Sequence, residues 1–376
     1  MSGGNDPERW IASKMRRIES SGIRKVFDLA RKLKDPINLS IGQPDFPVPE
    51  VCRAAAIRAI ESGHNSYTVT QGLASLRDRL GQQIAERYPT HADRRLLITS
   101  GTSGALVLAL ACILDPGDEI LACDPWFVMY PNLAELAGGT MKALPTGPDF
   151  LPDPEQVAAA IGPRTKALIV NSPANPTGAV MPASLMKTLA QICAEKGVLL
   201  ISDEIYSLFS YDGPHRSPAE FNEHVLVIDG FSKTYAMTGW RVGYVHGPAR
   251  LIEEMTKLQQ FTFVCAPSMA QHGALAALDL DMTPVVNAYR AKRDFMRAAL
   301  ADLYDIGPPG GAFYLYPRAP GGQLGTEFVN KAIANNLLII PGQVFSAADT
   351  HFRISYAVAD RELERGAELL RQLARS

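Results

Sequence analysis

The stretch from residue 165 to 206, "TKALIVNSPANPTGAVMPASLMKTLAQICAEKGVLLISDEIY", decides the fold class. Its two aliphatic runs, "ALIV" and "VLLI", have the length and the β-branched content of buried strands. Between them lies a segment whose apolar residues recur at the spacing of an amphipathic helix. Strands that are apolar at every position and are separated by helices are typical of a parallel sheet covered on both faces. The stretch therefore predicts a strand–helix–strand unit of an α/β protein.

The same alternation of strands and helices runs from about residue 90 to 245, and the C-terminal part mixes helices with short strands. A chain of 376 residues is also longer than one simple core needs. We therefore expect a large α/β domain over residues 45–285 with a mostly parallel sheet. Both chain ends, residues 1–44 and 286–376, are expected to form a smaller α+β domain.

Composition narrows the classes of function. The formal net charge is −2 and no long block of like charge occurs, which argues against nucleic acid and anionic membranes as partners. The longest uncharged apolar run, residues 104–114, is too short to span a bilayer. The N-terminal segment lacks an apolar stretch of signal-peptide length, and the five cysteines show no C-x-x-C spacing. These features predict a cytoplasmic protein with reduced thiols and no metal site.

In an open α/β sheet, ligands bind beyond the carboxyl ends of the strands, so the polar residues that follow each strand are candidate ligand-binding residues. Gly101, Thr102 and Ser103 follow "RLLITS" and open a helix, where backbone N–H groups and hydroxyls can bind an anion. An ordinary helix cap would look the same. Asn175 lies in "SPANPTG", which also fits a plain turn.

Charged residues follow the next two strands. Asp203 directly follows "GVLLIS", and Tyr206 comes three residues later. A carboxylate at the end of so apolar a strand needs a cation or hydrogen-bond donors, unless it caps a helix. Lys233 follows "VLVIDGFS" and is expected at the same edge of the sheet, with Arg241 a short turn further on. A second cation lowers the pKa of a lysine in a pocket and makes its amine a usable nucleophile.

These groups together define one task. Thr102, Ser103, Ser232 and Arg241 form a candidate anion site, beside an amine able to form an imine, a carboxylate and neutral donors. A pyridoxal phosphate enzyme needs such a set, because the cofactor requires a phosphate site, a lysine and an acid against its pyridine nitrogen.

Five segments, "SIGQPDF", "NSPANPTG", "ISDEIY", "SKTYAMTGWRVGY" and "FRISYA", carry a resemblance over residues 38–357. In this order and spacing they resemble the fold-type-I pyridoxal phosphate enzymes, specifically class I/II aminotransferases similar to bacterial aspartate and aromatic aminotransferases. The resemblance implies that Lys233 holds the cofactor as an internal aldimine and later moves the proton at the substrate Cα. It implies that Asp203 keeps the pyridine nitrogen protonated, and that Asn175 and Tyr206 bond the ring oxygen.

The resemblance assigns further residues to the phosphate and the substrate. Gly101, Thr102, Ser103, Ser232 and Arg241 would hold the phosphate, and Tyr67 would reach the phosphate of a neighbouring subunit, which implies a homodimer with the active site at its interface. Arg353 would bind the substrate α-carboxylate, with Gly42 and Asn175 beside it. In "PWFVMY", the spacing favours Phe127 over Trp126 as the ring that stacks on the cofactor.

The expected reaction moves the amino group of an L-amino acid to a 2-oxo acid through pyridoxamine phosphate. A carbon–sulfur β-lyase or an enzyme like aminocyclopropane carboxylate synthase is the alternative, because the same scaffold supports these reactions. A non-catalytic sensing module is a remote alternative. Aromatic and small residues in "QFTFVCAPS" favour a neutral or aromatic substrate side chain, although Arg24 could serve an acidic one.

Overall fold

The structure is a computed structural model that describes residues 7–18, 20, 22–23, 26 and 33–376. Its strands are β1 (Ile37–Asn38), β2 (Arg94–Thr99), β3 (Glu119–Asp124), β4 (Thr140–Pro145), β5 (Thr165–Asn171), β6 (Leu199–Asp203), β7 (Leu226–Gly230), β8 (Gly243–Pro248), β9 (Tyr314–Leu315), β10 (Leu337–Leu338), β11 (Ile340–Pro341) and β12 (Phe352–Ser355). Its α-helices are α2 (Glu50–Glu61), α3 (Ala74–Arg87), α4 (Gly101–Ile113), α5 (Met129–Leu136), α6 (Pro154–Ala160), α7 (Ala183–Lys196), α8 (Phe231–Thr234), α9 (Ala249–Gln260), α10 (Ser268–Ala277), α11 (Thr283–Leu300), α12 (Gly325–Ala334) and α13 (Asp360–Arg375). Short 3₁₀ helices are η1 (Pro7–Trp10), η2 (Ser13–Arg16), η3 (Ser207–Phe209), η4 (Pro218–Glu220), η5 (Thr238–Trp240), η6 (Pro320–Gly322) and η7 (Gly342–Val344).

The strand–helix–strand unit predicted from the sequence is β5, α7 and β6. The helix α7 ends at Lys196 and is capped by Gly197, whose φ of +66° is the left-handed conformation that glycine adopts without strain. The strands β5 and β6 pair in parallel, with Asn171 opposite Asp203 at their carboxyl ends. This register brings two polar side chains to one edge of the sheet.

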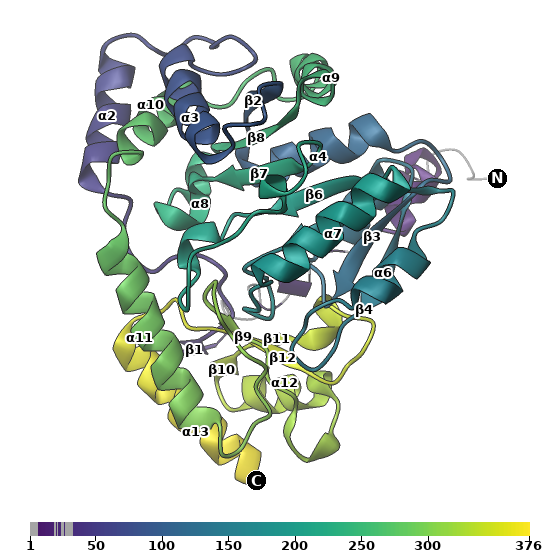
Figure 1. Ribbon diagram of the computed structural model, residues 1–376. Coiled ribbons are helices and arrows are strands. Elements are labelled where there is room, and N and C mark those ends of the chain that lie inside the picture. Colours follow the sequence, from purple (N-terminus) through teal and green to yellow (C-terminus); the bar gives the residue numbers. More distant parts are fainter. Residues whose placement is uncertain (1–6, 19, 21, 24–25, 27–32) are drawn as a thin grey trace, which may run out of the picture.

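A seven-stranded sheet in the order β2-β8-β7-β6-β5-β3-β4 forms the centre of the molecule (Figure 1). Its strands from β4 to β7 pair in parallel, and β8 runs antiparallel to both β7 and β2. The fold class expected from the sequence, a mostly parallel sheet in an α/β protein, is confirmed.

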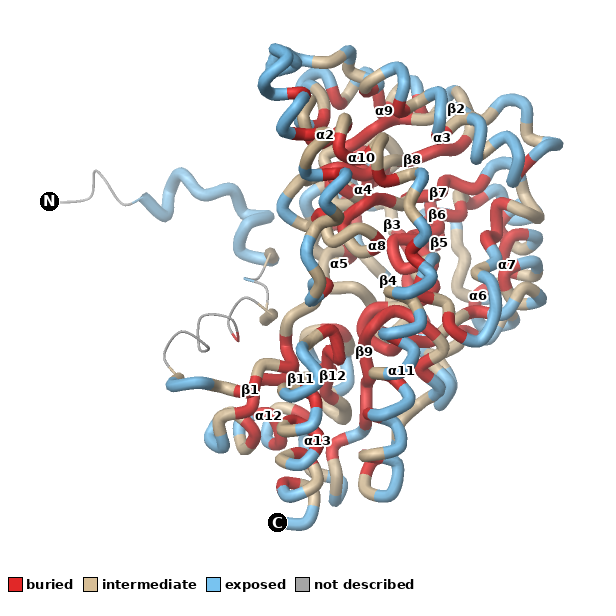
Figure 2. The backbone as a smooth tube through the Cα atoms, turned by 90° about the vertical axis from the view of Figure 1, so that its left-hand side faces the viewer, coloured by how far each residue is buried: buried red, intermediate tan, exposed pale blue. Residues whose placement is uncertain are grey.

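Helices cover both faces of this sheet, because alternate strand residues point to opposite sides. Ile169 and Ile201 pack with residues of α4, α5 and α9 on one face. Their neighbours Leu168 and Leu200 pack with residues of α7 on the other face, where α6 also lies. Figure 2 shows the buried stretches running through the strands and the inner sides of these helices. The same alternation decides which face each polar residue at the strand ends takes.

The segment around β1 and the C-terminal part of the chain lie together beside the large sheet. The strand β1 pairs in parallel with β10, and β11, β12 and β9 form a three-stranded antiparallel sheet. The long helix α11 runs from the large sheet to this part of the molecule, where it packs on α13 (Figure 1). The domain boundaries near residues 45 and 285 stay predictions. Among the described residues, no helix is both long enough and apolar enough to cross a membrane.

Candidate active site

A cavity of about 250 Å³ opens at the carboxyl ends of β5, β6 and β7. Its lining comes from the large sheet, from the segment around residue 42 and from the C-terminal sheet. The lining residues are Ile23, Gly42, Thr102, Ser103, Phe127, Asn171, Asn175, Asp203, Ile205, Tyr206, Ser232, Lys233, Thr238, Arg241, Tyr314 and Arg353. Residues that are more than 300 positions apart in the chain therefore share one site.

Asp203 is the buried acid of the cavity. Its Oδ2 accepts a hydrogen bond of 2.8 Å from the hydroxyl of Tyr130, and Asn171 donates to its backbone carbonyl at 2.9 Å. Burial raises the pKa of Asp203 to about 6, although the bond from Tyr130 works in the opposite direction. Sequence reasoning did not identify Tyr130 as a site residue, because its only signal in the sequence was its place one helical turn after Phe127.

Lys233 is the buried amine. It lies on the short helix α8, and its Nζ donates to the backbone carbonyl of Gly42 at 2.7 Å. Its pKa is lowered to about 8, first by burial and then by the positive charges of Arg353 and Arg241, while Asp203 acts in the opposite direction. A large share of the amine is therefore neutral near pH 8, which a nucleophilic role requires.

One end of the cavity is built for an anion. Thr102 and Ser103 lie in the first turn of α4, where unpaired N–H groups give a helix its positive end. Arg241 and Ser232 face the same space. Gly101 has a φ of +69°, a conformation that favours glycine, and a Cβ atom there would lie 2.6 Å from Arg241 Nη2 and displace the guanidinium.

Arg353 forms a second cationic point. Its side chain is fully buried on β12, with Nη1 donating to Asn175 Oδ1 at 3.0 Å and Nη2 donating to the Ser40 carbonyl at 2.8 Å. The guanidinium lies 4.6 Å from the ring centre of Tyr314 and 4.9 Å from that of Phe345. Its Nε has no partner within the described part of the chain. A buried cation with a free donor is suited to bind a carboxylate.

The structure brings most of the predicted site residues together, although it does not test their roles. Gly101 contacts this group through Arg241, and Phe127 lines the cavity, whereas Trp126 lines a different groove. Tyr67 does not line the cavity of its own chain and is 82% exposed. Arg24 lies outside the described residues. Sequence reasoning missed Tyr314 and Phe345, because neither lies in a motif that marks an arginine's partner.

The residues present fit pyridoxal phosphate. A dianion fits the helix end beside Arg241, an aldehyde fits the amine of Lys233, and a pyridine nitrogen fits the carboxylate of Asp203. In the described part of the chain, no cluster of three or more His, Cys, Asp or Glu side chains is placed to hold a metal ion.

Comparison with known proteins identifies the class. A family model described as "Aminotransferase class I and II" matches residues 34–370. The chain therefore belongs to the class I and II aminotransferases, as the resemblance implied.

Individual relatives cover nearly the whole chain. A probable aspartate aminotransferase of Methanocaldococcus jannaschii is 36% identical over 374 residues, which span 96% of this chain and 99% of the relative. The aspartate/prephenate aminotransferase of Thermus thermophilus is 37% identical and covers 92% of each chain. The structure of the Thermus thermophilus aspartate aminotransferase with maleate matches with a TM-score of 0.91 at 33% identity, covering 96% of this chain and 99% of that one. The predicted activity, enzymatic transfer of an amino group, is confirmed at the level of the family.

Proposed function

We propose that this aminotransferase holds pyridoxal 5′-phosphate on Lys233 and exchanges amino groups between an L-amino acid and a 2-oxo acid. The observation that carries the proposal is the position of the Lys233 amine. It is buried in one cavity with the Asp203 carboxylate and two guanidinium groups, and its pKa is lowered to about 8.

The two titratable groups have complementary tasks. When bound, pyridoxal phosphate supplies an electron sink that stabilises negative charge at the substrate Cα. Asp203 would hold the positive charge of the pyridine nitrogen, and Tyr130 orients its carboxylate. Lys233, as a neutral amine, would first bind the aldehyde carbon and later take the proton from the substrate Cα. Gly42 accepts from Lys233 and so points its amine into the cavity.

The remaining residues would bind and orient. Ser232, Arg241, Gly101, Thr102 and Ser103 would hold the phosphate at the helix end. Phe127 would pack on the flat pyridine ring of the cofactor.

On the substrate side, Asn175 and Tyr206 would bond the ring oxygen of the cofactor. Arg353 would take the α-carboxylate, for which its free Nε and its buried position are suited, with Gly42 and Asn175 beside it.

A second copy of the chain would complete the site. Tyr67 and Val69 are 82% and 60% exposed, and Phe261 is 82% exposed. Gln259 donates to the Thr70 carbonyl at 2.7 Å, which holds the segment with Tyr67 beside the end of α9, where Phe261 lies. Exposed aromatic and aliphatic side chains gathered in this way are typical of an interface. We assign this surface to a homodimer in which Tyr67 reaches the phosphate of the other subunit.

The substrate side chain is the least constrained part of the proposal. Among the described lining residues, the charged groups are Lys233, Arg241, Arg353 and Asp203, and all four have a task in the proposal. The rest of the lining is neutral, which supports a neutral or aromatic side chain. Relatives are named for aspartate and for aspartate or prephenate, so aspartate is the competing donor. The five cysteines are unpaired, which supports a reducing compartment, the cytoplasm.

Absorption spectroscopy tests the proposal. The purified protein with pyridoxal phosphate should show a yellow band that Lys233→Ala abolishes. Adding aspartate, phenylalanine or another single amino acid should convert the band to a shorter-wavelength form, and a 2-oxo acid should restore it. The amino acid that converts the band fastest names the substrate class. Absence of the band from the wild-type protein would contradict the proposal.

A further inference from the structure

Glu204 is a buried carboxylate directly after Asp203 that the proposed reaction does not use. Successive residues at the end of β6 point to opposite faces of the sheet. Asp203 points to the face of α5, where Tyr130 binds it, and it lines the cavity. Glu204 is 1% exposed, bonds Ser202 on the face of α7 and η4, and does not line the cavity. The two carboxylates are therefore chain neighbours with separate surroundings.

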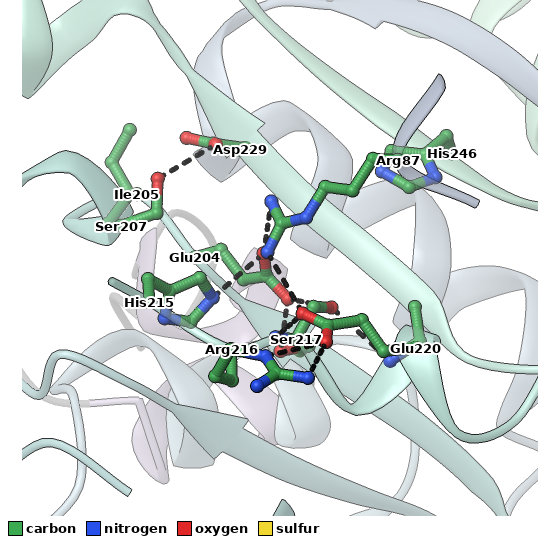
Figure 3. A network of polar contacts seen from close by, with 12 residues as sticks. Arg87, Glu204, Ile205, Ser207, His215, Arg216, Ser217, Glu220, Asp229 and His246 are labelled. Atoms are coloured by element: carbon green, nitrogen blue, oxygen red, sulfur yellow. Dashed lines mark hydrogen bonds and ion pairs between the residues drawn. The ribbon is translucent and has the colours of Figure 1, made fainter. Parts of the chain in front are cut away.

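The carboxylate of Glu204 is fully engaged (Figure 3). Its Oε1 accepts from Ser202 Oγ at 2.9 Å and from Ser217 Oγ at 2.5 Å. Its Oε2 lies 3.0 Å from His215 Nε2 and 3.9 Å from Arg87 Nη1. Figure 3 shows Arg87 and His215 approaching the carboxylate from different sides.

These contacts hold Glu204 in its charged form. Burial alone raises the pKa of a carboxyl group. For Glu204, the opposing effects of His215, Arg87 and Ser217 are larger, and they lower the pKa to about 2. A permanent negative charge therefore lies directly behind Asp203, and its field contributes to the raised pKa of Asp203.

The backbone of Glu204 connects the elements that carry the cavity residues. Its N–H donates to the Ile228 carbonyl of β7 at 2.8 Å, and β7 leads directly into the helix with Lys233. Its carbonyl accepts from Ser207 N at 2.7 Å, which closes the turn that contains Tyr206. A shift of Glu204 would therefore be transmitted to Asp203, to Tyr206 and to the end of β7.

We propose that Glu204 is a positioning residue that fixes Asp203 and Tyr206 against the cofactor. It acts through the contacts of its buried carboxylate with Ser202, Ser217 and His215 and through the turn that it begins. This inference rests on the proposed binding of pyridoxal phosphate. It gives Glu204 two effects at the site, one geometric and one electrostatic.

Other titratable and charged groups also surround the two carboxylates. The electrostatic effect of Glu204 on Asp203 must be separated from the effects of these groups. Facing Glu204 are Arg87 and Tyr88 at the end of α3, His215 before η4, Arg94 on β2, Asp229 on β7, and Tyr244 and His246 on β8. Facing Asp203 are Tyr130 on α5, Tyr206 and Lys233. A single charge change at Glu204 leaves all of these groups in place.

The test compares Glu204→Gln with Glu220→Gln in the full-length protein loaded with pyridoxal phosphate. Glu220 is a matched control, because it belongs to the same network through Arg216 and Arg87 and does not adjoin Asp203. The measurements are the pH midpoint of the visible absorption band, the Kd for pyridoxal phosphate, and kcat and KM separately. Unfolding in urea reports stability.

We expect Glu204→Gln to lower the pH midpoint by about half a unit or more, because removing a buried negative charge disfavours a protonated group nearby. We expect the Kd for pyridoxal phosphate to rise about 10-fold and kcat to fall more than KM changes. Glu220→Gln should leave the midpoint and the Kd unchanged. Glu204→Asp, which keeps the charge, should have a pH midpoint close to that of the wild-type protein.

Two outcomes would overturn the inference while the proposed function stands. A normal band in the wild-type protein, with a midpoint and Kd that Glu204→Gln leaves unchanged while stability falls, would make Glu204 a scaffold residue only. An equal midpoint shift in Glu220→Gln would show that the network acts nonspecifically. A wild-type protein without any band would overturn the proposed function itself, and this inference with it.

Discussion

The hydroxyl of Tyr130 donates a hydrogen bond of 2.8 Å to Oδ2 of Asp203, and both side chains are buried. The phenol comes from α5, which covers one face of the sheet, and the acid comes from the end of the strand β6, so a helix and a strand together fix the carboxylate. Because a donor favours the charged form of an acid, this bond opposes the effect of burial on the pKa of Asp203.

Tyr130→Phe should weaken cofactor binding, most strongly at low pH. Without the donor, the pKa of Asp203 rises above its present value of about 6. At pH 6, less of Asp203 is therefore ionised in the variant than in the wild-type protein. We expect the Kd for pyridoxal phosphate at pH 6 to rise about 10-fold or more, since a hydrogen bond to a charged group contributes about 1.5–3 kcal/mol. Titration of the apoprotein measures it. Tyr304→Phe, which removes a buried hydroxyl that bonds Leu370, should have no such effect.

Asp203→Asn should stabilise the apoprotein while abolishing amino transfer. Burial raises the pKa of Asp203 from 3.8 to about 6, so between these values the folded state binds more protons and its stability falls as pH rises. At pH 8 the full cost is present, and removing the charge should increase the unfolding free energy by up to about 3 kcal/mol. The gain should shrink as pH falls from 6 to 4. Urea unfolding at pH 8 and pH 4 measures it, and a variant less stable than wild type at pH 8 would contradict the prediction.

The rate at which pyridoxal phosphate attaches to Lys233 in the apoprotein should rise with pH, with a midpoint near pH 8. The pKa of this lysine is lowered from 10.5 to about 8 by burial, then by Arg353 and Arg241, so the reactive neutral amine appears at lower pH than on an exposed lysine. Trapping with borohydride at a series of pH values gives the rate. Arg353→Met should move the midpoint upward, whereas Arg318→Met, outside the cavity, should not. An unchanged midpoint in Arg353→Met would contradict the electrostatic explanation.

Gly42→Ala should impair catalysis without unfolding the protein. A Cβ atom at this position would lie 2.8 Å from Tyr314 Oη and 3.8 Å from Arg353 Nη2. Either the tyrosine or the Gly42 carbonyl that binds Lys233 must move, and a displacement of about 1 Å can cost about 100-fold in rate. We expect kcat/KM to fall about 10- to 100-fold with little change in the urea midpoint. Gly213→Ala, where a Cβ meets nothing within 4 Å, is the control.

Much of the site could be predicted because its residues follow strands. Asp203 ends β6 and Lys233 lies just after β7, and parallel strands deliver their carboxyl ends to one edge. Tyr130 and Tyr314 carry no comparable signal. A tyrosine on a helix or near a glycine pair is ordinary core sequence, and only the packing of α5 and β9 against the cavity gives it a partner.

Glu204 shows the same limit more sharply. "ISDEIY" presents two adjacent acids, and their order alone does not say which one faces the cavity. The alternation of the strand separates them by face, but the face that holds the cavity is known only after α5 and α7 have packed.

The sequence by itself determined the α/β class and the family, because buried parallel strands need continuous apolar runs and the five motifs stand in one order along the chain. Tertiary structure alone decided how the charges balance. It placed Arg353 from β12 and Gly42 from the N-terminal part beside Lys233 on α8. Protonation of a buried group depends on which charges and donors surround it, and those neighbours come from segments hundreds of residues apart.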